Sequence, residues 1–308
     1  KKIGLEGNVV KLIKTDDEEF SNYLKECIVR DNDNRRKRLE ITKKIQTQNT
    51  ELIQWREENQ RITEELNISL KQTEEAKVNA LNDLDILQKK LGIDECAAFD
   101  IQAVCSGFIY ALSVADKFIK TESAKNVLVV GADTMSTITD YSDRSNAILW
   151  GDGSGAVILS KSNEEGILST HIHAKGEYEE LLHVPRKEQQ GLKDTIDMKG
   201  NQVFKMAVNT LDMIVDETLN ANNLTKEDID WVVPHQANIR ILEATAKKLN
   251  MSMDKLIVTI DEQGNTSAAS IPLALDFGIK QKKIKPGHLI LMEAFGGGFT
   301  WGSALIRM

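Results

Sequence analysis

The stretch AAFDIQAVCSGFIYALSVADKFIK, residues 97–120, decides the fold because two apolar periodicities meet in it. Phe99, Ile101 and Val104 are spaced as the apolar residues of a short buried strand. Shortly after Cys105 the apolar spacing changes to three and four residues, which predicts an amphipathic helix. The stretch therefore predicts a strand, a tight turn that holds a thiol, and a helix.

The predicted position of Cys105 at a helix start suggests a chemical role. The unpaired N–H groups and the positive end of the helix dipole lower the pKa of a thiol that lies there, which favours the nucleophilic thiolate. The alternative is that Cys105 is a small buried apolar residue, as most free cysteines are. This stretch alone leaves both interpretations open.

Composition excludes several classes of protein. The chain has 308 residues and a net charge of −8, and an acidic chain is not a general nucleic-acid binder. No apolar run reaches the roughly 18 residues of a membrane span, so we expect no membrane segment. The cysteines at 27, 96 and 105 form an odd set without metal-ligand spacing. We therefore expect a reducing, cytoplasmic location and no bound metal.

Residues 1–90 differ from the rest of the chain. Residues 1–34 have no clear pattern, with short strand and helix signals. Residues 35–90 lack Gly and Pro, and their apolar residues follow heptad spacing in two registers joined by a stutter. This pattern predicts a helical coiled coil that could pair with another chain, and the alternative is a long solvated helix.

From residue 91 to 308, short apolar strands alternate with helical patterns, which predicts an α/β domain. The run at 126–133 is typical of a strand buried on both faces, and GDGSG at 151–155 of a turn between strands. Placing Cys105 over Ser267 reveals a weak internal repeat of strand, turn, helix and strand. We therefore expect two similar halves with buried parallel strands.

Further along the chain, the remaining elements follow the same alternation. The patterns predict strands at 166–176, 229–233, 256–260 and 288–296 and helices over 201–219 and 239–249, with a last strand at the C-terminus.

Three predicted turns at strand ends carry chemically useful side chains, namely Cys105, His235 and Asn265. Ligands of open α/β sheets bind beyond the carboxyl ends of strands, so these turns are expected to converge. The glycine run at 296–298 allows backbone N–H groups to approach a ligand closely and is a plausible oxyanion site. Singly, each residue has a structural alternative, since Asn is a common turn former and a lone His is often structural.

Five motifs together resemble the β-ketoacyl-acyl-carrier-protein synthase III family. They are AAFDIQAVCSGFIYAL, DRSNAILWGDGSGAVIL, DWVVPHQANIRI, GNTSAASIPLAL and EAFGGGFTWGSALIRM, and they span residues 91–308. The resemblance implies a thiolase-like αβαβα fold of two similar halves, a homodimer, and a decarboxylating condensation that starts type II fatty-acid synthesis. The implied substrates are acetyl-CoA or another short acyl-CoA and malonyl-acyl-carrier protein, with no cofactor.

The resemblance also implies a role for single residues. Cys105 would carry the acyl group, while His235 and Asn265 would support decarboxylation and condensation. The backbone N–H groups of Cys105 and Gly297 would form the oxyanion hole. The substrate and carrier-protein contacts would be Arg144, Asn238, Arg240 and Phe295.

Residues 1–90 depart from the family. The family carries there its first strands and a motif whose Trp and Arg grip coenzyme A, and no such motif stands in this segment. The alternative reading is therefore a composite coiled-coil scaffold whose thiolase-like part is incomplete, and weak coenzyme A binding is expected. A related thiolase or hydroxymethylglutaryl-CoA synthase fits the motifs GNTSAAS and PHQAN less well.

Overall fold

The computed structural model describes residues 50, 54, 84, 86–93, 95–185 and 194–308. The chain divides into two compact units, Lys1–Phe99 and Asp100–Met308, so the division falls a few residues after the composition change at residue 91. In the first unit, residues 86–91 are helical. The predictions for 1–34 and for a coiled coil over 35–90 fall almost wholly outside the described residues.

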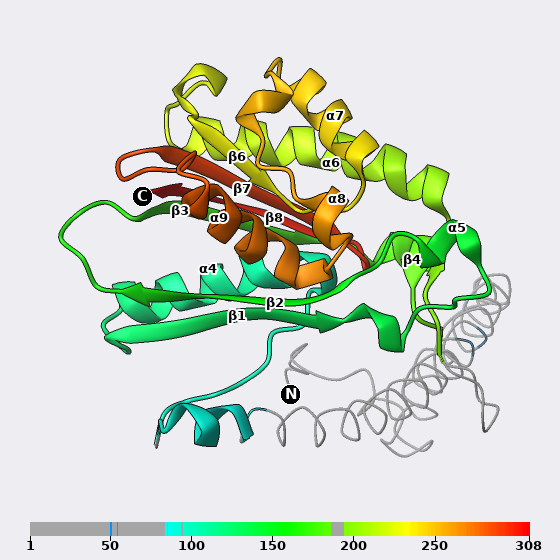
Figure 1. The fold of residues 1–308 in the computed structure, drawn as a ribbon, viewed down its shortest axis with the longest axis horizontal. Coiled ribbons are helices and arrows are strands. Elements are labelled where there is room, and N and C mark those ends of the chain that lie inside the picture. Colours follow the sequence, from blue (N-terminus) through cyan, green and yellow to red (C-terminus); the bar gives the residue numbers. More distant parts are fainter. Residues whose placement is uncertain (1–49, 51–53, 55–83, 85, 94, 186–193) are drawn as a thin grey trace, which may run out of the picture. The chain divides into compact units, whose positions relative to one another are not determined.

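The described part of the second unit is built of four alternating layers (Figure 1). A two-stranded antiparallel sheet of β1 (Asn126–Thr134) and β2 (Asp152–Ser160) forms one outer layer. Helices α4 (Gly107–Lys120) and α9 (Ser270–Lys280) lie between this sheet and a larger sheet. Helix α6 (Gly200–Ala221) covers the far face of the larger sheet and packs against helix α7 (Ile239–Lys248).

The larger sheet has the order β3-β8-β7-β6. Its strands are β3 (Ile167–Ala174), β6 (Trp231–Pro234), β7 (Leu289–Gly296) and β8 (Thr300–Arg307). β8 runs antiparallel to both β3 and β7, and only β6 and β7 are parallel. The expectation of buried parallel strands therefore holds only for β6 and β7. β1 and β7 are each followed along the chain by an antiparallel partner, β2 and β8, and such a pair needs no helical crossover.

The remaining elements are short, apart from one helix. They are α5 (Arg144–Ala147), α7 (Ile239–Lys248), α8 (Ile260–Gln263), β4 (Leu182–His183), β5 (Asp197–Met198) and the 3-10 turns at Val104–Ser106, Met135–Thr137, Gly176–Leu181, Lys226–Asp228, Met253–Lys255 and Ser267–Ala269.

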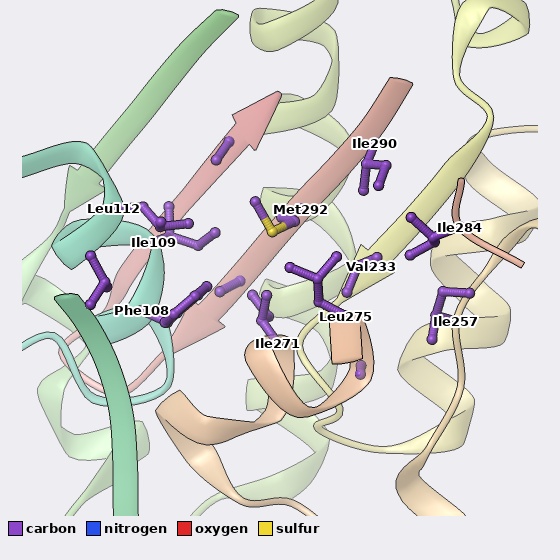
Figure 2. Close-up of a cluster of buried hydrophobic side chains, with 14 of the residues drawn as sticks. Phe108, Ile109, Leu112, Val233, Ile257, Ile271, Leu275, Ile284, Ile290 and Met292 are labelled. Carbon is purple, nitrogen blue, oxygen red and sulfur yellow. The ribbon is translucent and has the colours of Figure 1, made fainter. Parts of the chain in front are cut away.

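The central core lies between the two sheets, where the apolar faces of α4 and α9 meet (Figure 2). The predicted spacing after Cys105 places Phe108, Ile109 and Leu112 on one face of α4, and each is at most 3% exposed. Ile271 of α9 and Met292 of β7 complete the contact and are 1% exposed. Burial of each large apolar side chain stabilises the fold by about 1.5–3 kcal/mol, so this layer holds the two halves together.

The strand predicted at Phe99–Val104 is not formed. Residues 97–103 pair with no strand among the described residues, and Phe99 and Val104 are 53% and 47% exposed. A strand needs a hydrogen-bonded neighbour. Here the end of the segment is instead held by one side chain, because Oγ1 of Thr300 donates to the Ala103 carbonyl at 2.8 Å.

β1 exists as predicted, but its burial on both faces does not. Val129 is buried, while Leu128 and Val130 are 41% and 39% exposed, so the strand alternates. GDGSG does not form a turn, because its residues from Asp152 onward begin β2. Its glycines are required by packing, since a Cβ on Gly155 would come within 2.8 Å of Pro272 on α9.

Most other predicted elements are confirmed. The helices predicted over 201–219 and 239–249 and the strands before His235 and around the glycine run all form. The strand predicted at 256–260 is reduced to one bridge between Leu256 and Val232, because the chain turns into α8 directly afterwards.

The internal repeat is confirmed, with its register shifted by one residue. Two 3-10 turns, Val104–Ser106 and Ser267–Ala269, each begin with a residue of positive φ, +48° and +51°, and each leads into a helix. We name them the first and the second elbow. The helices begin at 107 and 270 and the following strands at 126 and 289, which is 163 residues apart in both cases. Cys105 therefore matches Ala268, and Ser267 matches Val104, because backbone geometry sets the register.

Among the described residues, no helix is long and apolar enough to cross a membrane.

Candidate active site

Cys105 is the middle residue of the first elbow and is 3% exposed. The elbow is anchored to the start of β8, where the hydroxyl of Ser106 donates to the carbonyl of Thr300 at 3.0 Å. The turn therefore places the sulfur at the N-terminal end of α4, as the sequence predicted, and fixes it on the central sheet.

The thiol differs from the prediction in its acidity. Burial, with a smaller contribution from the nearby carboxylate of Asp133, raises the pKa of Cys105 to about 12. A hydrogen bond from Oγ of Ser267, 3.6 Å from the sulfur, acts in the opposite direction. The predicted lowering by the helix terminus is therefore wrong for this free state, because removal of the thiolate from water outweighs the nearby dipoles.

His235 lies directly after β6 and is 6% exposed. Its backbone N–H donates to the carbonyl of Glu293 at 2.8 Å, which holds it at the edge of the sheet. Nδ1 of the ring lies 2.6 Å from Oγ of Ser270. Burial lowers the pKa of His235 to about 4, so the imidazole is neutral at neutral pH, as the sequence interpretation required.

Asn265 is held at both its backbone and its side chain. Its N–H donates to the carbonyl of Leu149 at 2.7 Å, and its Oδ1 accepts the N–H of Ser267 at 2.9 Å. The side chain is 4% exposed. Because the amide oxygen is occupied by the turn, the Nδ2 group is the donor that remains for a ligand.

The segment 265–270 brings the three predicted residues together. It contains Asn265, contacts Cys105 through Ser267 and contacts His235 through Ser270. A thiol, a neutral imidazole and a carboxamide thus gather around one turn in the interior. Such a set can form an acyl-thioester and donate hydrogen bonds to a developing oxyanion.

The glycine run lies beside this site, but the glycine next to the thiol is Gly296. A Cβ on Gly296 would lie 2.8 Å from the backbone N of Cys105, whereas one on Gly297 would lie 2.9 Å from the carbonyl of Leu182. Gly296 thus leaves room in front of the Cys105 N–H. The predicted contribution of the Gly297 N–H to an oxyanion hole stays a prediction.

The residues predicted at the substrate entrance lie on helix starts and on the sheet. Oδ1 of Asn238 accepts the N–H of Arg240 at 2.9 Å, so Asn238 caps α7. Arg240 and Arg144, the first residue of α5, are exposed, and in the described part of the chain neither forms an ion pair. Exposed arginines without partners fit contact with an acidic surface.

Phe295 is buried, as expected for a tunnel residue. Its ring centroid lies 4.5 Å from that of Phe299. Both rings belong to an apolar cluster with residues of α6 and α7. The predicted place of Phe295 in a substrate tunnel stays a prediction.

Sequence reasoning missed Ser267, Ser270 and Gln236. Gln236 is 1% exposed and joins the turn after β6 to residues 257–259: its Nε2 donates to the Ile257 carbonyl, and its Oε1 accepts the Thr259 N–H. The GNTSAAS motif contained both serines. Their three-residue spacing at a helix start is the signal that could have identified them as a pair on one face.

In the described ranges, no group of three or more His, Cys, Asp or Glu side chains is placed to hold a metal ion.

Comparison with known proteins places this geometry in a class. The family model of 3-oxoacyl-[acyl-carrier-protein] synthase III matches residues 99–176, and the family model of the C-terminal part of this synthase matches residues 219–308. The crystal structure of 3-oxoacyl-[acyl-carrier-protein] synthase III from Aquifex aeolicus matches with a TM-score of 0.70 and 47% identity, covering 73% of this chain and 71% of that one. Fold and family model thus define a thiolase-like condensing enzyme.

Two curated relatives narrow the class. The β-ketoacyl-[acyl-carrier-protein] synthase III of Thiobacillus denitrificans is 64% identical over 225 residues, covering 72% of this chain and 70% of the relative. That of Thioalkalivibrio sulfidiphilus is 60% identical over 228 residues, covering 72% and 71%. The chain belongs to the β-ketoacyl-acyl-carrier-protein synthase III family.

Proposed function

We propose that this chain catalyses the decarboxylating condensation of a short acyl-CoA, such as acetyl-CoA, with malonyl-acyl-carrier protein, the initiating step of type II fatty-acid synthesis. The observation that carries the proposal is the turn 265–270, which contacts Cys105 and His235 and contains Asn265. The comparisons favour this enzyme over a composite scaffold or a hydroxymethylglutaryl-CoA synthase.

The first half-reaction transfers the acyl group to the enzyme. The sulfur of Cys105 attacks the thioester carbonyl, the bond to the coenzyme A sulfur breaks, and the thiol proton leaves with free coenzyme A. Because burial raises the pKa of Cys105 to about 12, the thiolate forms only as the substrate arrives. The N–H of Cys105, beside Gly296, is placed to receive the charge on the carbonyl oxygen.

The second half-reaction removes CO2 from the malonyl group. Negative charge moves onto the thioester oxygen as the carbon–carbon bond breaks. Nε2 of neutral His235 and Nδ2 of Asn265 each donate one hydrogen bond to that oxygen. The enolate carbon then attacks the acyl carbonyl, and the Cys105 thiolate leaves, which regenerates the enzyme.

The proposal extends to partners. In this proposal Arg144, Asn238 and Arg240 bind an acidic carrier protein and its pantetheine arm, and Phe295 lines the path to Cys105. The exposure of both arginines and the burial of Phe295 among apolar side chains support it. A homodimer, a coiled-coil partner for residues 35–90, a cytoplasmic location and the absence of a bound cofactor are parts of the same proposal. They follow from the family resemblance and from the sequence patterns.

Replacement of Cys105 by Ala tests the central assignment. We expect condensation to be abolished while malonyl decarboxylation stays measurable, because His235 and Asn265 lie on other turns than the nucleophile. Radiolabelled acetyl-CoA measures transfer to the protein, and release of CO2 from malonyl-carrier protein measures decarboxylation. Full condensation by Cys105→Ala would refute the nucleophile assignment.

A further inference from the structure

The second elbow and the helix that follows it supply two buried hydroxyl groups to the site. Ser267 is the first residue of the elbow, and Ser270 is the first residue of α9. Each is 1% exposed. One hydroxyl contacts the sulfur of Cys105, and the other contacts the ring of His235. The thiol of the first half-reaction and the imidazole of the second are therefore each hydrogen-bonded to a different serine.

The contact of Ser270 bears on which nitrogen of His235 carries the proton. A neutral imidazole has one N–H donor and one acceptor nitrogen. Among the described residues, the Ser270 hydroxyl has no acceptor other than Nδ1 of His235, 2.6 Å away. A proton on Nδ1 would leave a buried hydroxyl without an acceptor, which is costly. The favoured arrangement has Ser270 donating to Nδ1 and the proton on Nε2.

The contact of Ser267 acts on the nucleophile. Its hydroxyl donates to the Cys105 sulfur at 3.6 Å, and a donor to sulfur favours the thiolate over the thiol. The backbone N–H of Ser267 is fixed by Oδ1 of Asn265 at 2.9 Å. The hydroxyl is thus held by a turn whose conformation is set by another residue of the site.

The second elbow has no nucleophile of its own, because Ala268 stands at the position of Cys105. Its N–H is occupied by Oδ2 of Asp133 at 2.9 Å. The second elbow therefore contributes to the site through its contact with Cys105 of the first elbow. We propose that Ser267 and Ser270 are two positioning residues with separate tasks: Ser267 supports formation of the Cys105 thiolate, and Ser270 holds His235 in the Nε2–H tautomer. This inference rests on the proposed function.

Ser270→Ala tests the tautomer. We expect decarboxylation of malonyl-carrier protein to fall about tenfold, the order for loss of one hydrogen bond to a reacting group, with a smaller change in acylation of Cys105 by acetyl-CoA. Nitrogen-15 NMR of histidine-labelled protein gives the second readout. The His235 signals, assigned with His235→Ala, should change from one Nε2–H form to a mixture of tautomers.

Ser267→Ala should have the opposite pattern. We expect acylation of Cys105 to fall about tenfold, and the pH profile of its alkylation by iodoacetamide to move to higher pH. Asp133 is the charged group that acts on this thiol, and the nearby His235 is neutral, so neither masks the shift. Decarboxylation, measured in a Cys105→Ala background, should change less.

Ser113→Ala is the matched control. Ser113 is a buried serine of α4 whose hydroxyl is hydrogen-bonded to Thr170, 2.9 Å away and outside the site. We expect both half-reactions to keep their rates in this variant. The inference is overturned if Ser267→Ala and Ser270→Ala lower both half-reactions equally, or if neither lowers its own. The proposed function fails separately, if Cys105→Ala still takes up the acyl group or His235→Ala still decarboxylates at the full rate.

Discussion

The two elbows share one backbone geometry and differ in what lies in front of their second residue. In the first elbow, Gly296 leaves room beside the N–H of Cys105. In the second, the position 163 residues earlier is Asp133, and its carboxylate accepts the N–H of Ala268 at 2.9 Å. The same turn is therefore open to a developing oxyanion in one half and filled by an anion in the other. We expect this difference between Gly296 and Asp133 to determine which elbow can stabilise an oxyanion.

Closing the first elbow gives the largest expected effect. In Gly296→Ala the new Cβ would lie 2.8 Å from the Cys105 N and 3.1 Å from its Cβ, so the backbone must move. We expect kcat/KM for condensation to fall about 10²–10³-fold, as when one oxyanion donor is lost. Gly176→Ala, where a Cβ meets nothing within 4 Å, is the control. Wild-type activity in Gly296→Ala would remove the contrast between the elbows.

The second half should carry decarboxylation by itself. His235→Ala and Asn265→Ala are each expected to slow CO2 release about 10²–10³-fold, because each removes one donor to the same oxygen. The double variant should cost less than the product of the two, since residues that act as a unit are not additive. Stopped assays of CO2 release from malonyl-carrier protein measure all three. Near wild-type release in either single variant would contradict this role.

The two halves also differ three residues before Gly296 on β7 and before Asp133 on β1. Val130 of β1 corresponds to Glu293 of β7, which is fully buried and has no hydrogen-bond partner for either carboxylate oxygen among the described residues. Burial, with a contribution from Asp212, raises the pKa of Glu293 to about 8. The folded state thus keeps a proton that the unfolded state releases near pH 4.5.

This difference predicts a pH-dependent stability. The free energy of unfolding should decrease from about pH 4.5 to 8 and level off above, because the native state binds more protons in this window. The loss is of order a few kcal/mol, at about 1.4 kcal/mol for each pKa unit. Urea unfolding of Glu293→Gln and wild type at pH 5 and pH 8 measures it. An equal pH dependence in both proteins would show that Glu293 is not the cause.

The smallest expected effect comes from the charge in the second elbow. Asp133→Asn keeps an oxygen for the Ala268 N–H and removes the charge that raises the pKa of Cys105. We expect a lower thiol pKa and an alkylation of Cys105 at pH 8 about twofold to fivefold faster, a fraction of one pKa unit. Mass spectrometry of the Cys105 peptide separates it from the exposed Cys96. A slower reaction would mean that Asp133 acts through the backbone and not through its charge.

The sequence predicted correctly those elements whose own apolar pattern determines which face is buried. The helix after Cys105 and the strand before His235 carry apolar patterns that fix the buried face, and both form. The strand at Phe99 failed because an apolar pattern does not supply a hydrogen-bonded partner. The turn predicted at GDGSG failed because its glycines are required by close packing against residues more than a hundred positions later in the chain, such as Pro272 beside Gly155.

The site shows the same division between local and distant causes. The convergence of Cys105, His235 and Asn265 could be predicted from their chemistry at turns next to apolar stretches, although the strand expected before Cys105 does not form and Asn265 follows a helix. The acidity of the Cys105 thiol could not, since it depends on the depth of burial and on Asp133. The shift of the internal repeat by one residue was also hidden, because φ at Val104 and Ser267 is a property of the backbone and leaves no mark in residue type.

The positive φ of these two residues has a consequence for heat tolerance. Val104 is β-branched, and such residues rarely adopt this conformation. A non-glycine residue held there costs about 1–3 kcal/mol, while a whole domain is stable by only about 5–15 kcal/mol. The strain at these two residues is therefore a substantial fraction of the net stability of a typical domain. Variants selected for survival at high temperature should accumulate Gly or Asn at 104 and 267. Their condensation rate should fall, because the Cys105 thiol is then held less firmly.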